Sequence, residues 1–264
     1  MKFEEKQARV LSVKLLQEGI YDMWIETLNI AEHAAAGQFV SVYTKDAGKL
    51  LPRPISICEA DGNRLRLVFR VAGGGTKEFA SYQAGETIHL IGPMGNGYPI
   101  RPDEDGNFPE LIRKKAILIG GGIGIPPMLE LARELQGEKT IVVGYRNKDT
   151  FLLEDLKAYG DVVIATDDGS LGTHGTVLDA IRKQGVTGEV IFACGPTPML
   201  RGVKAYAKEQ GMEAYISLEE KMACGIGACL ACVCQSTETD DHSKVKNKRI
   251  CADGPVFPAE EVTL

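Results

Sequence analysis

The sequence predicts a multidomain chain of mixed class: an antiparallel β-barrel, then a doubly wound α/β domain with a parallel sheet, then a small cysteine-rich domain. Three observations predict this architecture. Short runs of branched and aromatic residues recur up to about residue 100, apolar runs then alternate with helical segments, and four cysteines crowd into residues 221–234. We expect the three domains to span residues 1–102, 103–216 and 217–264.

The composition is that of a globular protein long enough to bury more than one core. The chain has 264 residues, of which 44% are hydrophobic and 25% charged, with a formal net charge of −6. This mild acidity disfavours a nucleic-acid partner. The N-terminus lacks the features of a secretory signal and no apolar run is long enough to cross a membrane, so we expect a cytoplasmic protein without a membrane partner.

The first hundred residues are predicted to form an antiparallel barrel or sandwich. Six apolar runs are separated by turn residues such as those at 60–63, at a spacing of roughly ten residues that is typical of such folds. A helical turn near residues 77–82 fits as a connection. The runs are ARVLSVKLL, YDMWIETL, GQFVSVYT, PISICEA, RLRLVFRV and TIHLIGP.

A polar, proline-bearing stretch at 100–110 is the best candidate for a linker, and beyond it strands alternate with helices. Parallel strands need crossover connections, which place helices on both faces of the sheet. The expected strands are KKAILIG, TIVVGYR, DVVIATD, EVIFACG and EAYISLE, and the expected helices PMLELARELQ, FLLEDLKAYG, TVLDAIRKQG and PMLRGVKAYAKEQG.

A glycine-rich run, IGGGIGIPPM at 119–128, follows the first strand of the second domain and leads into a helix. Glycines at 120, 121, 122 and 124 let the backbone approach a ligand, and the free N–H groups of the helix start favour a pyrophosphate. We therefore take Gly120, Gly121, Gly122 and Gly124 as candidates for binding NAD. The run is not the GxGxxG fingerprint, and a tight turn without a ligand is the alternative.

Two further segments of this domain follow expected strands at the edge where open parallel sheets bind ligands. Cys194, Gly195 and Pro196 end one strand beside the glycine-rich run, although Cys194 is equally explained as a buried packing residue. Asp167 and Asp168 follow another strand. Their carboxylates would accept hydrogen bonds from ribose hydroxyls and repel a 2′-phosphate, which favours NAD(H) over NADP(H).

In the barrel region, Arg53, Pro54, Ile55 and Ser56 form a stiff, strand-like segment. The guanidinium is suited to bidentate phosphate contact, and the hydroxyl can hydrogen-bond a flavin ring or a phosphate. This short pattern is weak by itself.

A second glycine-rich turn follows Phe69, Arg70 and Val71, and it leads through Gly75 and Thr76 into the short helix. Such a turn can cradle another phosphate. Two phosphate-suited features in a β domain beside a dinucleotide-type domain indicate that each domain binds one electron carrier.

The cysteines are the most specific signal. Cys224, Cys229 and Cys232 have the spacing C-x4-C-x2-C, and with the distant Cys251 they match the plant-type [2Fe–2S] arrangement. The small spacers let the backbone N–H groups approach the sulfurs. Cys234 falls outside this spacing and is interpreted as spare.

A structural zinc ion is the main alternative for the cysteines. Such a site more typically pairs two C-x2-C units or adds histidines, whereas this segment has one such unit, and His242 is isolated from it.

With these motifs in view, the chain resembles the electron-transfer subunits of class 1B dihydroorotate dehydrogenases, within the wider ferredoxin-reductase family. The resemblance covers essentially the whole chain, and the order of the motifs makes it specific. They are RPIS, FRVAGGGT, LIGPMGNGY, IGGGIGIPP, ACGPTPML, YISLEEKMACGIGACLACVC and CADGPVF.

The resemblance implies an FAD-binding barrel, an NAD-binding domain and a [2Fe–2S] domain. Residues 53–56, 69–71 and 75–76 match three FAD motifs, and the four cysteines match the cluster ligands. It also implies a partner, an FMN-containing catalytic subunit that oxidises dihydroorotate, in a heterotetramer with two copies of each chain. Electrons would run from that FMN through the cluster and FAD to NAD⁺.

Two other functions stay open at this point. The small subunit of an NAD(P)H:ferredoxin oxidoreductase or of a sulfhydrogenase-type complex would look similar over the same domains. A zinc-stapled, nucleotide-sensing interaction module without redox activity belongs to another class. The longer charged segment between Cys232 and Cys251 departs from the family pattern and leaves the partner contacts of the tail uncertain.

Overall fold

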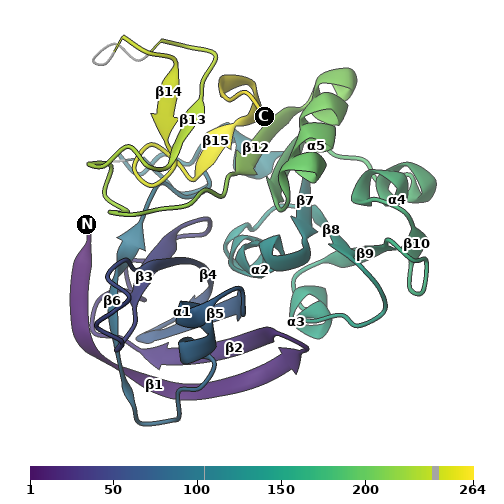
Figure 1. The fold of residues 1–264 in the computed structure, drawn as a ribbon. Helices are drawn as coiled ribbons and strands as arrows, with labels where there is room; N and C mark the ends of the chain where they lie inside the picture. The colour runs from purple at the N-terminus through teal and green to yellow at the C-terminus, as the bar shows by residue number, and fades with distance from the viewer. Residues whose placement is uncertain (104, 240–243) are drawn as a thin grey trace.

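A computed structural model describes residues 1–103, 105–239 and 244–264, so His242 and part of the charged segment 236–249 lie outside the described residues (Figure 1). A β-barrel and a parallel sheet with its helices lie side by side, and the C-terminal segment extends above the junction between them. The predicted fold class is confirmed. No helix in the described ranges is long and apolar enough to cross a bilayer.

The N-terminal part is a closed barrel of six strands in the order β1-β2-β5-β4-β3-β6, with every neighbouring pair antiparallel. The six apolar runs of the sequence form these strands, and the closure excludes the alternative of an open sandwich. Inward-facing side chains such as Val10, Ile25, Val40 and Leu65 are fully buried, as the alternation of side chains along a strand requires. The strands are β1 Phe3–Gln17, β2 Ile20–Glu26, β3 Phe39–Tyr43, β4 Arg53–Asp61, β5 Arg64–Arg70 and β6 Thr87–Met94.

The one α-helix of the barrel region, α1 Gly74–Phe79, begins earlier than the helical turn expected near 77–82. The Thr76 hydroxyl accepts hydrogen bonds from the backbone N–H groups of Ala72 and Gly73, at 2.9 and 3.2 Å. These contacts satisfy donors ahead of the first helical turn, so the helix starts directly at the glycine run.

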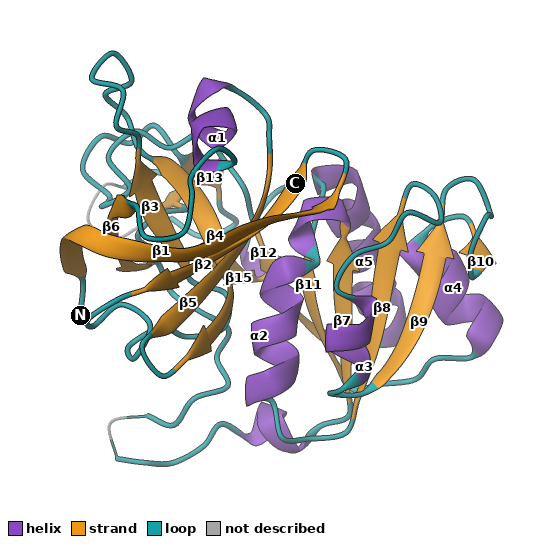
Figure 2. Ribbon diagram, turned by 90° about the horizontal axis from the view of Figure 1, so that it is seen from below, coloured by secondary structure: helices purple, strands orange, loops and turns teal. Residues whose placement is uncertain are grey.

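The second part is a seven-stranded sheet in the order β10-β9-β8-β7-β11-β12-β15, parallel except for its last strand. Helices cover both faces (Figure 2): α2 and α3 lie on the face toward the barrel, and α4 and α5 on the other. The strands are β7 Ala116–Gly121, β8 Lys139–Tyr145, β9 Asp161–Thr166, β10 Thr173–His174, β11 Val190–Cys194, β12 Glu213–Ser217 and β15 Val256–Pro258, and the helices α2 Pro126–Glu134, α3 Leu153–Lys157, α4 Val177–Gln184 and α5 Thr197–Gln210.

The C-terminal segment leaves the sheet after β12 and returns to it as β15, which pairs antiparallel with β12. Between these strands it forms a small hairpin of β13 Val233–Gln235 and β14 Asn247–Arg249. The segment has too few apolar residues for a core of its own, and it buries Phe257 and Val262 in the core that the sheet shares with α4 and α5.

Helix α2 joins the barrel to the sheet. Its buried Glu130 accepts a hydrogen bond from the backbone N–H of Ala60 at 3.2 Å, and its Glu134 accepts one from Ala36 at 3.0 Å. A second connection runs from Arg66 on β5 to Asp155 on α3, at 2.7 Å. These contacts fix the two parts around the space between them.

Candidate functional site

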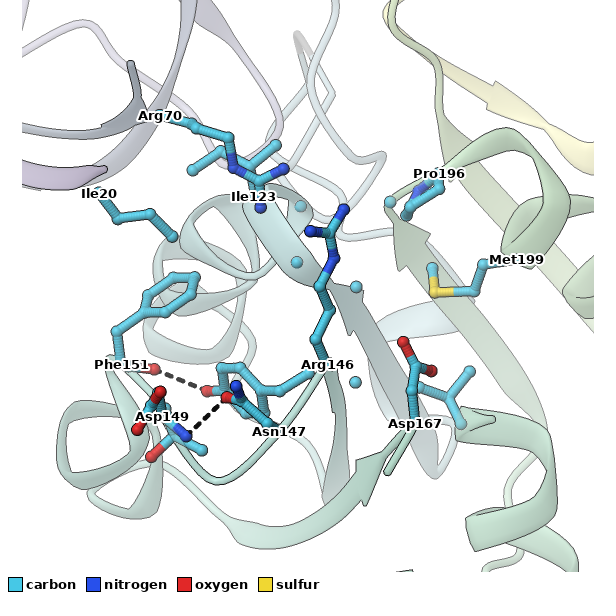
Figure 3. Close-up of a pocket in the computed structure, with 18 of the residues that line it drawn as sticks. Ile20, Arg70, Ile123, Arg146, Asn147, Asp149, Phe151, Asp167, Pro196 and Met199 are labelled. Atoms are coloured by element: carbon cyan, nitrogen blue, oxygen red, sulfur yellow. Dashed lines mark hydrogen bonds between the residues drawn. The ribbon is translucent and has the colours of Figure 1, made fainter. Parts of the chain in front are cut away.

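A cleft of about 1440 Å³ lies between the barrel and the parallel sheet. The barrel contributes the turn 16–20 between β1 and β2 and the end of β5. The sheet contributes the loops that follow β7, β8, β9 and β11, which all leave the same edge because the strands are parallel (Figure 3). This is the edge at which open parallel sheets bind ligands.

The glycine-rich run forms the floor of the cleft. Gly121, Gly122 and Gly124 line it, whereas Gly120 lies behind them in β7, with its α-carbon facing Ile125. A Cβ at Gly124 would overlap the carbonyl of Cys194, so the sequence needs glycine where this loop crosses the end of β11. The loop leads into α2, but the free N–H groups expected at the helix start are not there. Pro126 and Pro127 have no N–H, and the N–H groups of Ile125 and Met128 donate to the carbonyls of Gly122 and Ile125, at 3.1 and 3.0 Å.

Among the other residues predicted to bind the dinucleotide, some line the cleft and one lies behind it. Asp167, Gly195 and Pro196 line the cleft, so the structure brings them together with the glycine loop. Cys194 does not line it. Its thiol is buried, and burial together with the nearby Glu219 raises the pKa of Cys194 to about 12, so the thiol is protonated at neutral pH and acts in packing.

Arg146 and Glu219 also line the cleft, and sequence motifs did not single out Arg146. The Arg146 side chain rises from the end of β8 toward Ile123 and Pro196, and Arg70 reaches the same part of the cleft from the barrel (Figure 3). The signal for Arg146 was present in the sequence, because Arg146 is the last residue of the expected strand TIVVGYR, at the ligand-binding edge.

The candidate FAD residues lie on the barrel. Arg53 and Gly75 are brought together: a Cβ at Gly75 would lie 2.7 Å from the Arg53 Nε, so the guanidinium rests against the first turn of α1. Arg53 also donates a hydrogen bond to the carbonyl of Leu51. Pro54, Ile55 and Ser56 follow along β4 and are half-buried. A guanidinium beside the glycine start of a helix fits the diphosphate of FAD.

The residues of the second FAD motif, 69–71, do not all face the same region. Phe69 is buried and packs edge-on against Phe79 of α1, with ring centroids 6.1 Å apart, so its ring joins β5 to the helix. Arg70 and Val71 turn instead toward the cleft. Arg70 reaches the glycine loop, and its Nη2 would lie 3.7 Å from a Cβ at Gly122.

The four predicted cluster cysteines lie close together in two pairs. Cys224 interacts with Cys229, and Cys232 interacts with Cys251, whose backbone N–H donates to the Cys232 sulfur at 3.4 Å. Backbone N–H groups also reach the sulfurs of Cys224 and Cys251, from Ile226 at 3.4 Å and from Gly227 at 3.1 Å. This loop therefore presents N–H donors to sulfur, as an iron–sulfur site requires.

The thiols differ in acidity because their surroundings differ. Burial raises the pKa of Cys224, but hydrogen bonds from the backbone of Ile226 and Cys229 outweigh it and lower the pKa to about 6. Burial and the neighbouring Cys232 raise the pKa of Cys251 to about 12. Cys234 lies apart on β13, opposite Lys248.

The pairing bears on which metal centre fits. A [2Fe–2S] cluster has two irons, each held by two thiolates, whereas a structural zinc ion gathers four ligands at one centre. Two neighbouring pairs of cysteines fit the two-iron cluster.

Comparison with known proteins agrees with this geometry. Residues 219–263 match the family model described as the iron-sulfur cluster binding domain of dihydroorotate dehydrogenase B. Two relatives are named "Dihydroorotate dehydrogenase B (NAD(+)), electron transfer subunit". The protein from Geobacillus sp. (strain WCH70) is 40% identical over 268 residues, covering 99% of each chain. The protein from Bacillus cereus (strain G9842) is 40% identical over 262 residues, covering 97% of each chain.

Solved structures share the fold. An NADH-dependent reduced ferredoxin-NADP oxidoreductase structure matches with a TM-score of 0.84 and 27% identity, over 98% of this chain and 90% of that one. A flavohemoglobin from Malassezia yamatoensis has the same fold over 80% of this chain and 57% of its own, with a TM-score of 0.64 and 18% identity. Together with the near-complete match to the Geobacillus and Bacillus proteins, this shows that the chain belongs to the family of dihydroorotate dehydrogenase B electron transfer subunits.

Proposed function

We propose that this chain is the electron transfer subunit of an NAD-linked dihydroorotate dehydrogenase that acts in pyrimidine biosynthesis. Electrons from dihydroorotate pass from the FMN of a catalytic partner through a [2Fe–2S] cluster and FAD to NAD⁺. One observation carries the proposal. The segment that holds the paired cysteines begins at Glu219, which lines the dinucleotide-sized cleft, so a single chain connects a nucleotide site to a cluster site.

The barrel would hold FAD. Arg53 and the glycine start of α1 would bind its diphosphate, and the half-buried Ser56 hydroxyl would hydrogen-bond the flavin or a phosphate. When bound, FAD supplies hydride exchange with the nicotinamide and single-electron exchange with the cluster. The residues assigned to FAD are Arg53, Pro54, Ile55, Ser56, Phe69, Arg70, Val71, Gly75 and Thr76.

The cleft would hold NAD(H), with the pyrophosphate over the glycine loop and the adenosine ribose near Asp167. Arg146 points at the same loop and supplies positive charge for the phosphates. The residues assigned to NAD(H) are Gly120, Gly121, Gly122, Gly124, Asp167, Cys194, Gly195 and Pro196, of which Gly120 and Cys194 support the site from behind.

We assign the cluster ligands as Cys224, Cys229, Cys232 and Cys251, and the domain bounds at residues 1–102, 103–216 and 217–264 stay predictions from the sequence. We propose that the catalytic partner binds over the cluster, in a complex with two copies of each chain. The apolar side chains of Ile226 and Leu230 are 54% and 61% exposed beside the ligands, as a surface covered by a partner would be. None of the seven cysteines forms a disulfide, which suits the cytoplasm.

Exchange of single cysteines tests the cluster assignment. Cys251→Ser should abolish the visible absorption and the electron paramagnetic resonance signal of the reduced cluster, while FAD content and NADH oxidation by an artificial acceptor stay largely intact. Cys234→Ser is the matched control and should leave the cluster spectrum unchanged. Loss of the cluster from Cys234→Ser alone would show that the wrong cysteine was assigned.

A second candidate function is the small subunit of an NAD(P)H:ferredoxin oxidoreductase, which the TM-score of 0.84 to the oxidoreductase structure favours. Initial rates with NADH and NADPH, and copurification with an FMN-containing partner, separate the two. A strong preference for NADPH, with no such partner, would support the second candidate. Colourless protein that contains zinc would contradict both.

A further inference from the structure

Glu219 occupies a defined place at the edge of the parallel sheet. It follows β12, whose last residue, Ser217, pairs in register with Cys194 at the end of β11. Glu219 therefore emerges beside the loop at Gly195, and its side chain lines the cleft. The electrostatic effect of Glu219 on the Cys194 thiol agrees with this placement.

Arg70 faces Glu219 from the barrel side of the cleft. Solvent reaches Glu219 through the open cleft, but the protein surrounds the carboxyl group closely enough that desolvation raises its pKa, and the Arg70 guanidinium opposes that shift. Arg70 also approaches the glycine loop at Gly122. Glu219 thus lies where the end of β5, the glycine loop and the end of β11 meet.

Given the proposed function, the position of Glu219 indicates which end of the bound NAD(H) it faces. Arg70 and Val71 belong to the barrel segment assigned to FAD and line the cleft, and Arg70 is near enough to Glu219 to act on its carboxyl group. Asp167, assigned to the adenosine ribose, follows β9, and strands β8, β7 and β11 separate β9 from β12, which Glu219 follows. The nicotinamide must reach the flavin, so it lies at the Glu219 end.

We propose that the Glu219 carboxylate makes the cleft prefer NAD⁺ to NADH. The two ligands have the same phosphates, riboses and adenine, but the oxidised ring carries a positive charge that the reduced ring lacks. A carboxylate beside the ring attracts the cationic form, and this attraction is strengthened where protein walls replace water. The cationic ring in turn favours the ionised carboxylate. The cleft would therefore take up NAD⁺ and release NADH, which suits electron flow toward NAD⁺.

Binding constants test the proposal without turnover. We would titrate oxidised holoprotein with NAD⁺ and with 1,4,5,6-tetrahydro-NAD, a neutral and unreactive analogue of NADH, by isothermal calorimetry. Glu219→Gln should weaken NAD⁺ binding by about tenfold and leave binding of the neutral analogue within about twofold, while Glu219→Asp should retain most of the preference. The adjacent Glu220→Gln, whose side chain is outside the cleft lining, should change neither constant.

A second variant distinguishes a specific effect on the cationic ring from a general loss of dinucleotide binding. Arg146→Ala should weaken both ligands by the same factor, because their phosphates are identical. Equal weakening of both ligands by Glu219→Gln, or no change in either, would overturn the role of Glu219. If the unmodified protein bound neither ligand, the proposed function itself would fail.

Discussion

At the scale of single residues, Gly75 shows how one missing side chain shapes the barrel site. The Arg53 guanidinium occupies the space that a Cβ at Gly75 would need, at 2.7 Å from Nε, and an alanine there would push the arginine away from the helix start. Arg53 is the residue proposed above to bind the diphosphate of FAD.

We expect Gly75→Ala to weaken FAD binding by about tenfold, which corresponds to about 1.4 kcal/mol, and to leave the barrel folded. Fluorescence titration of the deflavinated protein with FAD measures this. Gly73→Ala is the control, because a Cβ at Gly73 meets no atom within 4 Å and its backbone is extended, at a φ of −175°. Equal losses in both variants would mean that displacement of the arginine is not the cause.

Residue identity alone indicated which cysteines lie together and which glycine run borders the cleft, but it did not indicate which side chains face the cleft. Phe69 and Cys194 both stand in motifs, yet both are buried in packing contacts. Arg146 stands in no motif, yet it points into the cleft. The difference arises because the direction of a side chain depends on packing between elements that are distant in the sequence.

At the scale of elements, strand β5 ties the barrel to the α/β part through one buried cation. Arg66 forms ion pairs with Asp22 on β2 at 3.0 Å, with Glu59 on β4 at 3.2 Å and with Asp155 on α3 at 2.7 Å. The Arg66 and Asp22 side chains are each only 9% exposed. Removing the arginine would leave a buried carboxylate without its cation.

Arg66→Ala is expected to lower the free energy of unfolding by about 3–5 kcal/mol, since an uncompensated buried charge is costly. Arg64 on the same strand also pairs with an aspartate, Asp61, but its side chain is 54% exposed. Arg64→Ala should therefore cost no more than about 1 kcal/mol. Urea unfolding followed by circular dichroism measures the free energy of unfolding of both variants. Similar losses would mean that the buried ion pairs of Arg66 stabilise the fold no more than the exposed pair of Arg64.

Long elements with a clear period were predictable, and short ones were not. The six barrel strands and the helices α2, α4 and α5 fall on runs that the sequence pattern marks. Strands β10 and β15 have two and three residues, too few to show a period, and they exist only because a neighbouring strand offers its backbone. Helix α3 is shorter than the expected segment 151–160, because Phe151 lines the cleft and Leu152 has a left-handed backbone, with a φ of 61°, just before the helix.

At the scale of the whole molecule, a ligand bound in the cleft would connect the barrel to the α/β part. Its lining comes from the barrel turn at 16–20 and from the sheet-edge loops, so a dinucleotide would contact both. A ligand that binds only the folded state raises stability by mass action, by about 2.7 kcal/mol at one hundred times its dissociation constant.

We expect NAD⁺ at that concentration to raise the melting temperature of the holoprotein by roughly 5–10 °C. NADP⁺ at the same concentration should raise it less, because Asp167 repels the 2′-phosphate. Differential scanning calorimetry measures both shifts. An equal shift with NADP⁺ would argue against the role of Asp167, and a shift confined to one of two separate transitions would mean that the ligand contacts one part alone.

The return of the tail as β15 makes the cysteine segment modular. Its entry and exit points are neighbours, since the backbone N–H of Leu218 donates to the carbonyl of Pro255 at 2.9 Å. A short turn linking these two positions could bypass the metal-binding segment and leave both flanking strands paired. Conversely, a reductase of this fold that ends near β12 could gain a site for one-electron transfer if such a cysteine segment were added after that strand. The order of the other strands in its sheet would not change.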